Sequence, residues 1–503
     1  MADESLNELI ALRIEKLNAL VEMGQDPFEV TEYRRTHHTK DILDNFEELD
    51  GKTVKIAGRM MSRRGQGKVT FADIRDLEGK IQGFFRFDDL GEEAYNILKS
   101  YVDVGDILGI EGYVFKTKMG EISIHVEKFV ILSKALRPLP DKWSGLKDVE
   151  IRYRQRYVDL ITSEDVKNNF VTRSKVIQAI RTMLGGREFL EVETPMMHSI
   201  PGGAAARPFI THHNALDMTL YLRIAPELYL KRLIVGGMEK VYEINRSFRN
   251  EGIDTRHNPE FTMLEVYEAY ANYEDMMRLS EDIFAAALMA THGTLKIEYQ
   301  GQEIDFTAPW KRISMTDALK EFGNVDTSKL NDLPSAIELC KSLNVHVPKN
   351  ATLSTLLNNL FEEFVEPNIV QPTFITDHPT AISPLAKRHK DNKEITERFE
   401  IFVAGRELGN AFSELNDPID QKGRFEEQVA AKAAGDDEAH EMDNDYIRAL
   451  EYGMPPTGGL GIGIDRLVML LIDTPSIRDV ILFPQLKKER SDEQEIDEEE
   501  NEE

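Results

Sequence analysis

Apolar residues near the start of the chain recur at the three- and four-residue spacing of an amphipathic helix. The pattern covers residues 6–23 and stops at Gly24, a residue type that commonly follows the last turn of a helix. We expect this helix to pack against the segment that follows it. The positions that define its face are Leu6, Leu9, Ile10, Arg13, Leu17 and Leu20.

Five strand-like runs follow between Thr53 and Leu132. A helical stretch near residues 92–101 separates the third run from the fourth. This order of elements is typical of the OB-fold, a five-stranded barrel that often binds single-stranded nucleic acid. The runs are TVKIAGRMM, KVTFADIRD, KIQGFFRF, DILGIEGYVF and EISIHVEKFVIL.

The predicted barrel carries residue types that bind unpaired bases. Phe71 and Phe84 can stack on bases, and Gln82 can hydrogen-bond to them. The segment 59–68 contains four cations, Arg63 among them, and no acid, so its local field favours a phosphate backbone. The alternative is that both phenylalanines fill the barrel core, which is the commoner place for a single phenylalanine in a strand.

Two further predicted strands, around residues 243–249 and 261–267, are joined by a polar loop. Alternation leaves Leu264 and Val266 on one face of the second strand, so the other face carries groups that a core does not need. An ordinary exposed hairpin gives a similar pattern, but a cation, carboxylates and an aromatic side by side are typical of a nucleotide site. The residues on this face are Glu243, Asn245, Ser247, Arg249, Phe261, Met263, Glu265 and Tyr267.

A glycine-rich stretch, GGLGIGIDR at residues 458–466, precedes the apolar run LVMLLI. It predicts a strand that enters a helix, with Arg466 in the first turn. Glycines allow the backbone to approach a planar ligand, on which the guanidinium can stack. The spacing differs from GxGxxG, so no dinucleotide-binding fold is predicted.

These stretches resemble a known family. FRNE followed by RHNPEFT is similar to motif 2, and GxGxGxDR to motif 3, of the class II aminoacyl-tRNA synthetases. PGGAAARPF, APELYLKRL, HNPEFTMLEVY and GNAFSELND resemble the lysyl-tRNA synthetases in particular. The resemblance covers nearly the whole chain, from about residue 5 to 487.

The resemblance implies an α+β multidomain protein. Its parts are an N-terminal helix and OB-fold anticodon-binding domain at 1–145 and a catalytic domain with an antiparallel sheet at 146–488. A helical insertion is expected at about 310–370, and 489–503 forms an acidic tail that we expect to be disordered. The segment FLEVETP at 189–195 resembles motif 1, which in the family builds a homodimer interface.

Composition bounds these expectations without deciding them. The 503 residues carry a formal charge of −28, but ten acids and one arginine fall in the tail, so a tRNA partner stays possible. No apolar run is long enough for a membrane span, and no signal peptide is evident, which favours the cytoplasm. The single cysteine, Cys340, is expected to be a buried apolar group.

Activation of an amino acid by ATP needs no general base, because a carboxylate is already ionised at neutral pH. The task is positioning and neutralisation of phosphate charge. By resemblance, Arg249 contacts the α-phosphate and the amino-acid carboxylate, and Arg466 caps the adenine or reaches the γ-phosphate; these two are the catalytic candidates. The other nucleotide-binding candidates are Glu251, His257, Asn258, Phe261, Glu400 and Glu407.

Glu400 and Glu407 are also the candidate metal ligands. Magnesium prefers carboxylate oxygens and can bridge phosphates, and the family uses up to three Mg²⁺ ions with ATP. Without the resemblance, two glutamates seven residues apart would be read as ordinary surface residues.

Lysine selection requires anions that replace the water lost by an entering ammonium group. Asn410, Phe412 and Glu414 alternate along one predicted strand and so share a face. The resemblance implies that Glu414 and Tyr267 hold the ε-ammonium with support from Glu265. Arg249 faces the carboxylate, and the α-amino group meets Glu227 and the backbone near Gly203. For Glu227, which follows a proline at a predicted helix start, simple compensation of the helix dipole is the alternative.

The implied activity is ATP-dependent attachment of L-lysine to tRNA(Lys) by a cytoplasmic homodimer without membrane contact. Aspartyl and asparaginyl synthetases share the motifs, but a glutamate-rich pocket disfavours an acidic substrate. An enzyme that lysylates an elongation factor would lack the barrel. A non-catalytic RNA-binding derivative would have lost Arg249, Glu407 or Arg466, and all three are present.

Overall fold

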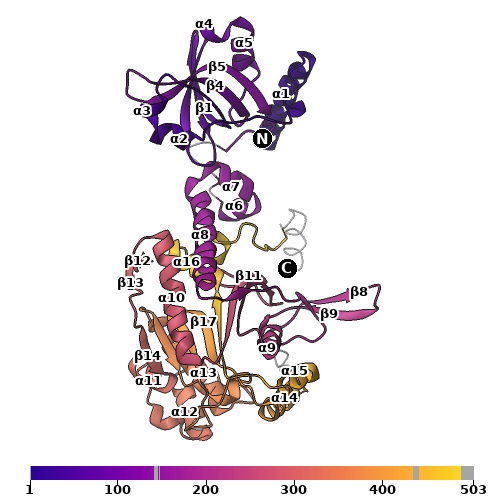
Figure 1. The fold of residues 1–503 in the computed structure, drawn as a ribbon, viewed down its shortest axis with the longest axis vertical. Coiled ribbons are helices and arrows are strands. Elements are labelled where there is room, and N and C mark those ends of the chain that lie inside the picture. The colour runs from indigo at the N-terminus through magenta and orange to yellow at the C-terminus, as the bar shows by residue number, and fades with distance from the viewer. Residues whose placement is uncertain (1, 141–145, 147, 434–440, 489–503) are drawn as a thin grey trace, which may run out of the picture. The chain divides into compact units, whose positions relative to one another are not determined.

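The computed structural model describes the chain except residues 1, 141–145, 147, 434–440 and 489–503. It forms two compact units, Met1–Asp148 and Val149–Glu503 (Figure 1). The predicted domain boundary near 145 and the predicted acidic tail therefore fall outside the described residues. No helix within the described ranges has the length and apolar character needed to cross a membrane.

The N-terminal unit is a closed five-stranded barrel of order β1-β2-β3-β5-β4, which confirms the predicted OB-fold. All neighbouring strands are antiparallel except β3 and β5. The strands are β1 (Thr53–Gln66), β2 (Val69–Arg75), β3 (Lys80–Arg86), β4 (Ile107–Lys116) and β5 (Ile122–Ser133). The helices are α1 (Ala2–Glu22), α2 (Thr39–Asp44), α3 (Phe46–Leu49), α4 (Phe87–Leu90) and α5 (Glu92–Ser100).

The N-terminal helix α1 packs on the barrel, as its apolar face predicts. Leu20 is fully buried in the same cluster as the barrel core. Arg13 donates hydrogen bonds to the carbonyls of Val104, Ala135 and Arg137, and Lys16 pairs with Asp103. These polar contacts and the buried Leu20 side chain therefore hold the helix against the barrel, although Leu9 of the predicted apolar face is exposed.

The second unit is built on an eight-stranded sheet of order β14-β15-β16-β17-β18-β11-β10-β6. It is antiparallel apart from the outer pairs β14–β15 and β10–β6, so the predicted antiparallel catalytic sheet is confirmed. The strands are β6 (Leu190–Glu191), β10 (Lys240–Phe248), β11 (Glu260–Ala269), β14 (Lys311–Ser314), β15 (Thr373–Thr376), β16 (Arg398–Val403), β17 (Arg406–Ser413) and β18 (Thr457–Gly463). Within the motif 1 segment, Leu190–Glu191 form the short strand that pairs with β10.

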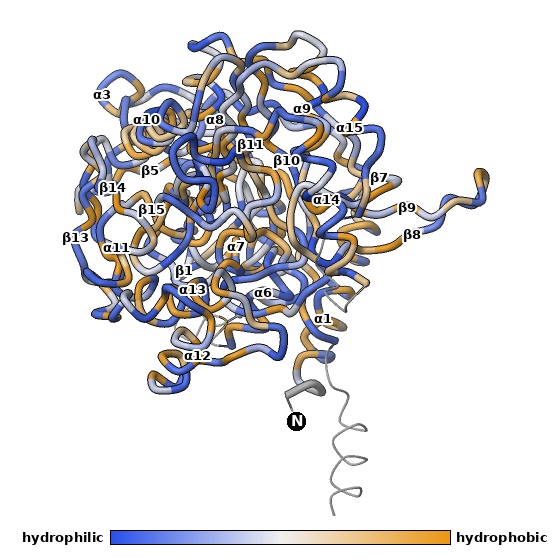
Figure 2. The backbone as a smooth tube through the Cα atoms, turned by 90° about the horizontal axis from the view of Figure 1, so that it is seen from below, coloured by the Kyte–Doolittle hydropathy of each residue, from blue (hydrophilic) through white to orange (hydrophobic). Residues whose placement is uncertain are grey.

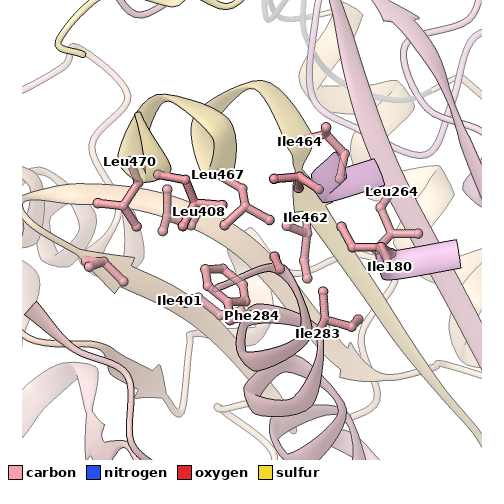
Figure 3. Packing of buried hydrophobic residues seen from close by; sticks show 14 of the residues in the cluster. Ile180, Leu264, Ile283, Phe284, Ile401, Leu408, Ile462, Ile464, Leu467 and Leu470 are labelled. Atoms are coloured by element: carbon pink, nitrogen blue, oxygen red, sulfur yellow. The ribbon is translucent and has the colours of Figure 1, made fainter. Parts of the chain in front are cut away.

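One face of this sheet is covered by helices and forms the main core (Figure 3). Ile180 of α8 (Glu164–Gly186), Phe284 of α10 (Tyr273–Thr291) and Leu467 of α16 (Ile464–Leu471) pack on it and are almost completely buried. Asn272 caps α10 by accepting hydrogen bonds from two backbone amides of its first turn. The opposite face of the central strands is left for polar side chains.

The chain between the parallel strands β14 and β15 forms a small helical layer with its own core. Its helices are α11 (Met315–Glu321), α12 (Leu333–Ser342) and α13 (Leu353–Phe364). Leu319, Cys340 and Leu360 are completely buried there, and Cys340 is a free thiol, as expected. Parallel neighbours need a crossover connection, and these helices supply it.

The remaining elements include a projecting hairpin and a helical group with its own core. The hairpin β8–β9 extends away from the rest of its unit (Figure 2). Helices α9, α14 and α15 share a separate core around Phe425 and Tyr446. The bounds are α6 (Val149–Arg154), α7 (Arg156–Thr162), β7 (Met197–His198), β8 (Ile210–His213), β9 (Met218–Leu222), α9 (Glu227–Val235), β12 (Lys296–Tyr299), β13 (Gln302–Asp305), α14 (Pro418–Ala433) and α15 (Asn444–Glu451).

Candidate functional site

A cavity of about 300 Å³ lies on the polar face of the central strands. It is lined from β11, β17 and β18, from the start of α9, and from the loop between β10 and β11. Of the predicted catalytic, nucleotide and lysine residues, only Glu400 does not line it. Those that do are Gly203, Glu227, Arg249, Glu251, His257, Asn258, Phe261, Glu265, Tyr267, Glu407, Asn410, Phe412, Glu414 and Arg466.

The register of three strands explains this convergence. Tyr267 of β11 and Phe412 of β17 both lie opposite Gly459 of β18, which runs between them. A Cβ at position 459 would lie 1.8 Å from Oε1 of Glu414 and 2.8 Å from Cε1 of Tyr267. The strand therefore needs glycine here, because the side chains of its neighbours lean over it.

Three buried glutamates, Glu227, Glu265 and Glu414, gather at the inner end of the cavity and are called the carboxylate pocket below. The Tyr267 hydroxyl donates to Oε2 of Glu265 across 3.0 Å. Oε2 of Glu414 forms an ion pair with Lys231, while Oε1 has no hydrogen-bond partner within the described part of the chain. A buried carboxylate oxygen that lacks a partner and lines a cavity marks a place for a cationic ligand.

Electrostatics in the carboxylate pocket is dominated by the loss of water. Burial, with the negative charge of Glu227 nearby, raises the pKa of Glu265 to about 8. Burial also raises the pKa of Glu414 and of the Tyr267 hydroxyl well above their ordinary values. The carboxyl group of Glu265 therefore keeps its proton at neutral pH, and an entering cation displaces it.

Glu227 does more than compensate the dipole of α9. Its side chain is buried, and its Oε1 accepts a hydrogen bond from Lys231 Nζ across 2.5 Å. Lys231 was missed by the sequence analysis. The available signal was its place four residues after Glu227 in the predicted helix of APELYLKRL, the spacing at which side chains meet.

The outer part of the cavity holds the predicted nucleotide residues. The Arg249 guanidinium carbon lies 5.1 Å from the ring centroid of Phe261, and its buried Nε has no hydrogen-bond partner among the described residues. His257 Nδ1 lies 2.9 Å from Oδ2 of Asp254. The amide of Asn258 is already used, since it donates to the Glu260 carbonyl and accepts from the backbone amide of Gln485.

Glu400 lines a second cavity, of about 520 Å³, which also includes His257, Glu407 and Arg466. Arg398 Nη2 donates to Oε1 of Glu400 across 2.6 Å. Arg466 Nη1 donates to the carbonyl of Glu407 and to its Oε2. The sequence analysis missed further charged lining residues of this cavity, which are Arg256, Glu362, Glu366, Arg398 and Arg406.

The charges of this second cavity fit a polyphosphate with bound cations. Arginines match phosphate oxygens, and the two glutamates are hard ligands of the kind Mg²⁺ takes. Across the described ranges, no group of three or more His, Cys, Asp or Glu side chains is arranged to hold a metal ion. Oxygens of a bound nucleotide would therefore have to complete the coordination of a Mg²⁺ ion at Glu400 and Glu407.

On the barrel, the rings of Phe71 and Phe84 are tilted against each other with their centroids 5.1 Å apart, and both lie outside the core, which contains Phe85 instead. Gln82 Nε2 donates to Oε2 of Glu121. Arg63 Nη1 donates to the backbone carbonyls of Leu98, in the last turn of α5, and of Val102, just after it. Part of its guanidinium therefore stabilises the fold. Whether these four residues bind an anticodon stays a prediction.

Two family descriptions match the chain. Residues 148–487 match "tRNA synthetases class II (D, K and N)", and residues 54–132 match "OB-fold nucleic acid binding domain".

Curated relatives extend over almost the whole length. Lysine–tRNA ligase of Pelotomaculum thermopropionicum is 60% identical over 487 residues, which is 96% of this chain and 96% of that relative. Lysine–tRNA ligase of Syntrophomonas wolfei is 58% identical over 98% of this chain and 100% of that relative. That of Carboxydothermus hydrogenoformans is 58% identical over 97% and 99%. With the catalytic sheet, the barrel and this similarity, the chain belongs to the class II tRNA synthetases of the D, K and N group.

Proposed function

We propose that this protein attaches L-lysine to tRNA(Lys) in two steps. ATP and lysine first form lysyl-adenylate with release of pyrophosphate, and the lysyl group then passes to tRNA with release of AMP. The observation that carries the choice of lysine is the carboxylate pocket, where Glu414 is buried and only one of its two oxygens is paired within the described residues. Curated relatives that are 60% and 58% identical to this chain bear the name of this activity.

In the first step the lysine carboxylate attacks the α-phosphorus, and Arg249 lines the same cavity as the carboxylate pocket and the predicted nucleotide residues. Its guanidinium neutralises the charge that builds up on the phosphate and orients the attacking carboxylate. Phe261 would lie under the adenine, and Arg466 would cap its other face or reach the γ-phosphate. Glu251, His257 and Asn258 would complete the nucleotide site.

Mg²⁺ would be held by Glu400 and Glu407 together with phosphate oxygens of ATP, and it would neutralise the charge of the leaving pyrophosphate. The arginines of the second cavity would share that task. Arg398 and Arg466, each bonded to one of the two glutamates, keep the carboxylates in place before the nucleotide enters.

For substrate choice, Glu414, Tyr267 and Glu265 would receive the ε-ammonium. Glu227 and the backbone near Gly203 would receive the α-amino group, and Asn410 and Phe412 would line the stem. An aspartate side chain in this pocket would face three carboxylates, which disfavours the aspartyl alternative.

The barrel would bind the anticodon through Arg63, Phe71, Gln82 and Phe84. We further infer that the enzyme acts as a homodimer through the motif 1 segment, and in the cytoplasm. Both follow from the family rather than from a contact seen in this chain.

Amino-acid-dependent exchange of pyrophosphate into ATP tests this function. Each of the twenty amino acids is offered in turn, with Mg²⁺ and without tRNA. Exchange with lysine alone supports the proposal. Exchange with aspartate or asparagine would assign the chain to another specificity, and no exchange with any amino acid would favour a non-catalytic derivative.

A further inference from the structure

Lys231 is a completely buried side chain whose ammonium group reaches the carboxylate pocket from helix α9. Its Nζ lies 2.5 Å from Oε1 of Glu227, forms an ion pair with Glu414, and lies 5.3 Å from the ring centroid of Phe412. Three residues that the proposed function assigns to lysine binding thus contact one lysine of the protein itself.

The Lys231 side chain keeps its positive charge in this dry location. Burial alone lowers the pKa of a lysine, but the adjacent carboxylates of Glu227 and Glu414 outweigh burial and raise the pKa above its ordinary value. A helix needs only the contact with Glu227, one turn earlier on α9. The second contact, with Glu414 after strand β17, joins two separate elements through one cation.

The two carboxylates that Lys231 holds have different tasks in the proposed function. Glu227 receives the α-amino group of the substrate, and Glu414 receives the ε-ammonium. Because both contact the same ammonium of the protein, the distance between the two anchors is fixed by Lys231. Without this cation the two buried anions would repel each other and separate.

Charge balance gives the same residue a second task. At neutral pH Glu265 keeps its proton, so Glu227 and Glu414 carry two negative charges against the one positive charge of Lys231. A diamino acid brings two ammonium groups, which match that excess charge and the charge of Glu265 once its proton is displaced, while its carboxylate faces Arg249. A monoamino acid brings one ammonium group and leaves Glu265 protonated and without a cationic partner.

We propose that Lys231 is a specificity-determining positioning residue, which clamps Glu227 and Glu414 at one separation so that the pocket accepts a diamino acid of one chain length. This inference rests on the proposed function. A merely structural ion pair would affect all substrates alike, whereas a clamp affects the choice between substrates of different length.

The test compares lysine with ornithine, its homologue shorter by one methylene, in ATP–pyrophosphate exchange. Lys231→Met keeps an apolar stem of similar size and removes the charge. We expect kcat/KM for lysine to fall by about tenfold or more, mainly through KM. The ratio of kcat/KM for lysine to kcat/KM for ornithine should fall by a similar factor, while KM for ATP stays unchanged.

Arg232→Met is the matched control, because Arg232 is the next cation on α9 and pairs with Asp443 outside the carboxylate pocket. It should leave the lysine-to-ornithine ratio at the parental value. Lys231→Gln provides a second variant if Lys231→Met does not fold, since its polar side chain is tolerated beside carboxylates but is shorter than lysine and carries no charge. The lysine-to-ornithine ratio of Lys231→Gln should fall in the same way.

The outcomes separate the two proposals. A parent enzyme without lysine-dependent exchange would overturn the proposed function and this inference with it. A parent that exchanges with lysine, together with a folded Lys231 variant that keeps the parental lysine-to-ornithine ratio, would overturn the clamp alone.

Discussion

Tyr267 and Glu265 are joined by a hydrogen bond of 3.0 Å and point from the same face of β11 into the carboxylate pocket. The hydroxyl stabilises the ionised carboxylate, but burial outweighs it and leaves the pKa of Glu265 at about 8. The other charged groups that act on this carboxylate are Glu227, Arg223, Glu243 and Glu414.

A pH dependence of lysine binding follows from this carboxylate. Below its pKa the empty pocket keeps a proton on Glu265, and an entering ammonium group must expel it. KM for lysine should therefore fall as pH rises from about 6.5 towards 8, by up to about tenfold per pH unit, and then level off. Steady-state exchange across this range measures it, with KM for ATP as the internal control.

Glu265→Gln should make KM for lysine nearly independent of pH in the same window. A variant that keeps the parental slope would assign the titration to another group in the pocket.

Arg249→Ala should nearly abolish adenylate formation. It removes the cation beside the reacting phosphate, at an expected cost on the order of 3 kcal/mol or more in the transition state. Lysine-dependent pyrophosphate exchange measures the loss, and an unchanged melting temperature shows that the fold survives. Exchange within about tenfold of the parent would count against this role.

Glu407→Gln should raise the Mg²⁺ concentration needed for activity, because one ligand charge is lost while the side chain keeps its size. A Mg²⁺ titration of the exchange rate measures this. Glu362→Gln is the control, since Glu362 lines the same cavity from α13 and accepts a hydrogen bond from Asn358. Coincident titration curves for parent and Glu407→Gln would remove Glu407 from the metal site.

Glu414→Gln should weaken lysine binding by roughly 2 to 4 kcal/mol and leave ATP binding almost unchanged. The ε-ammonium would lose its counter-charge in a site without water, and Lys231 would keep only Glu227. Calorimetric titration with each ligand separates the two effects. Equal losses for lysine and ATP would indicate a misfolded pocket.

Phe71→Ala should weaken tRNA recognition by roughly 1 to 3 kcal/mol while lysine activation without tRNA stays intact. Phe71 is half-buried and outside the barrel core, so its removal should barely lower the melting temperature. Phe85→Ala is the contrasting variant, because Phe85 is completely buried and its loss should cost about 3 to 5 kcal/mol of stability. A large drop in melting temperature for Phe71→Ala, with no effect specific to the anticodon, would contradict the stacking role.

Local periodicity accounts for much of what the sequence could predict. The two-residue period of β11 placed Glu265 and Tyr267 on one face, and the order of runs in the barrel was sufficient for the OB-fold. These features depend on neighbours within one element, where the pattern of residues and the geometry of the backbone coincide.

Contacts between distant elements were harder to predict. Arg256, Arg398 and Arg406 meet in the second cavity from three segments, and no spacing in the sequence connects them. Lys231 looked like one more cation on a helix, because its contact with Glu414 arises only when β17 packs beside α9. Motif resemblance predicted residues that line the cavities, but it did not predict the charged side chains, such as Lys231 and Arg398, that pair with them.

Gly459 leaves room for the side chains of Glu414 and Tyr267 because it has no side chain of its own. One methyl group at this position would occupy the space of a Glu414 oxygen and the edge of the Tyr267 ring. A substitution at position 459 should therefore change the substrate preference of the enzyme, although glycine has no side chain that could contact a ligand. A search for variants of altered specificity should include position 459 as well as the three glutamates, because the backbone of Gly459 lines the pocket there.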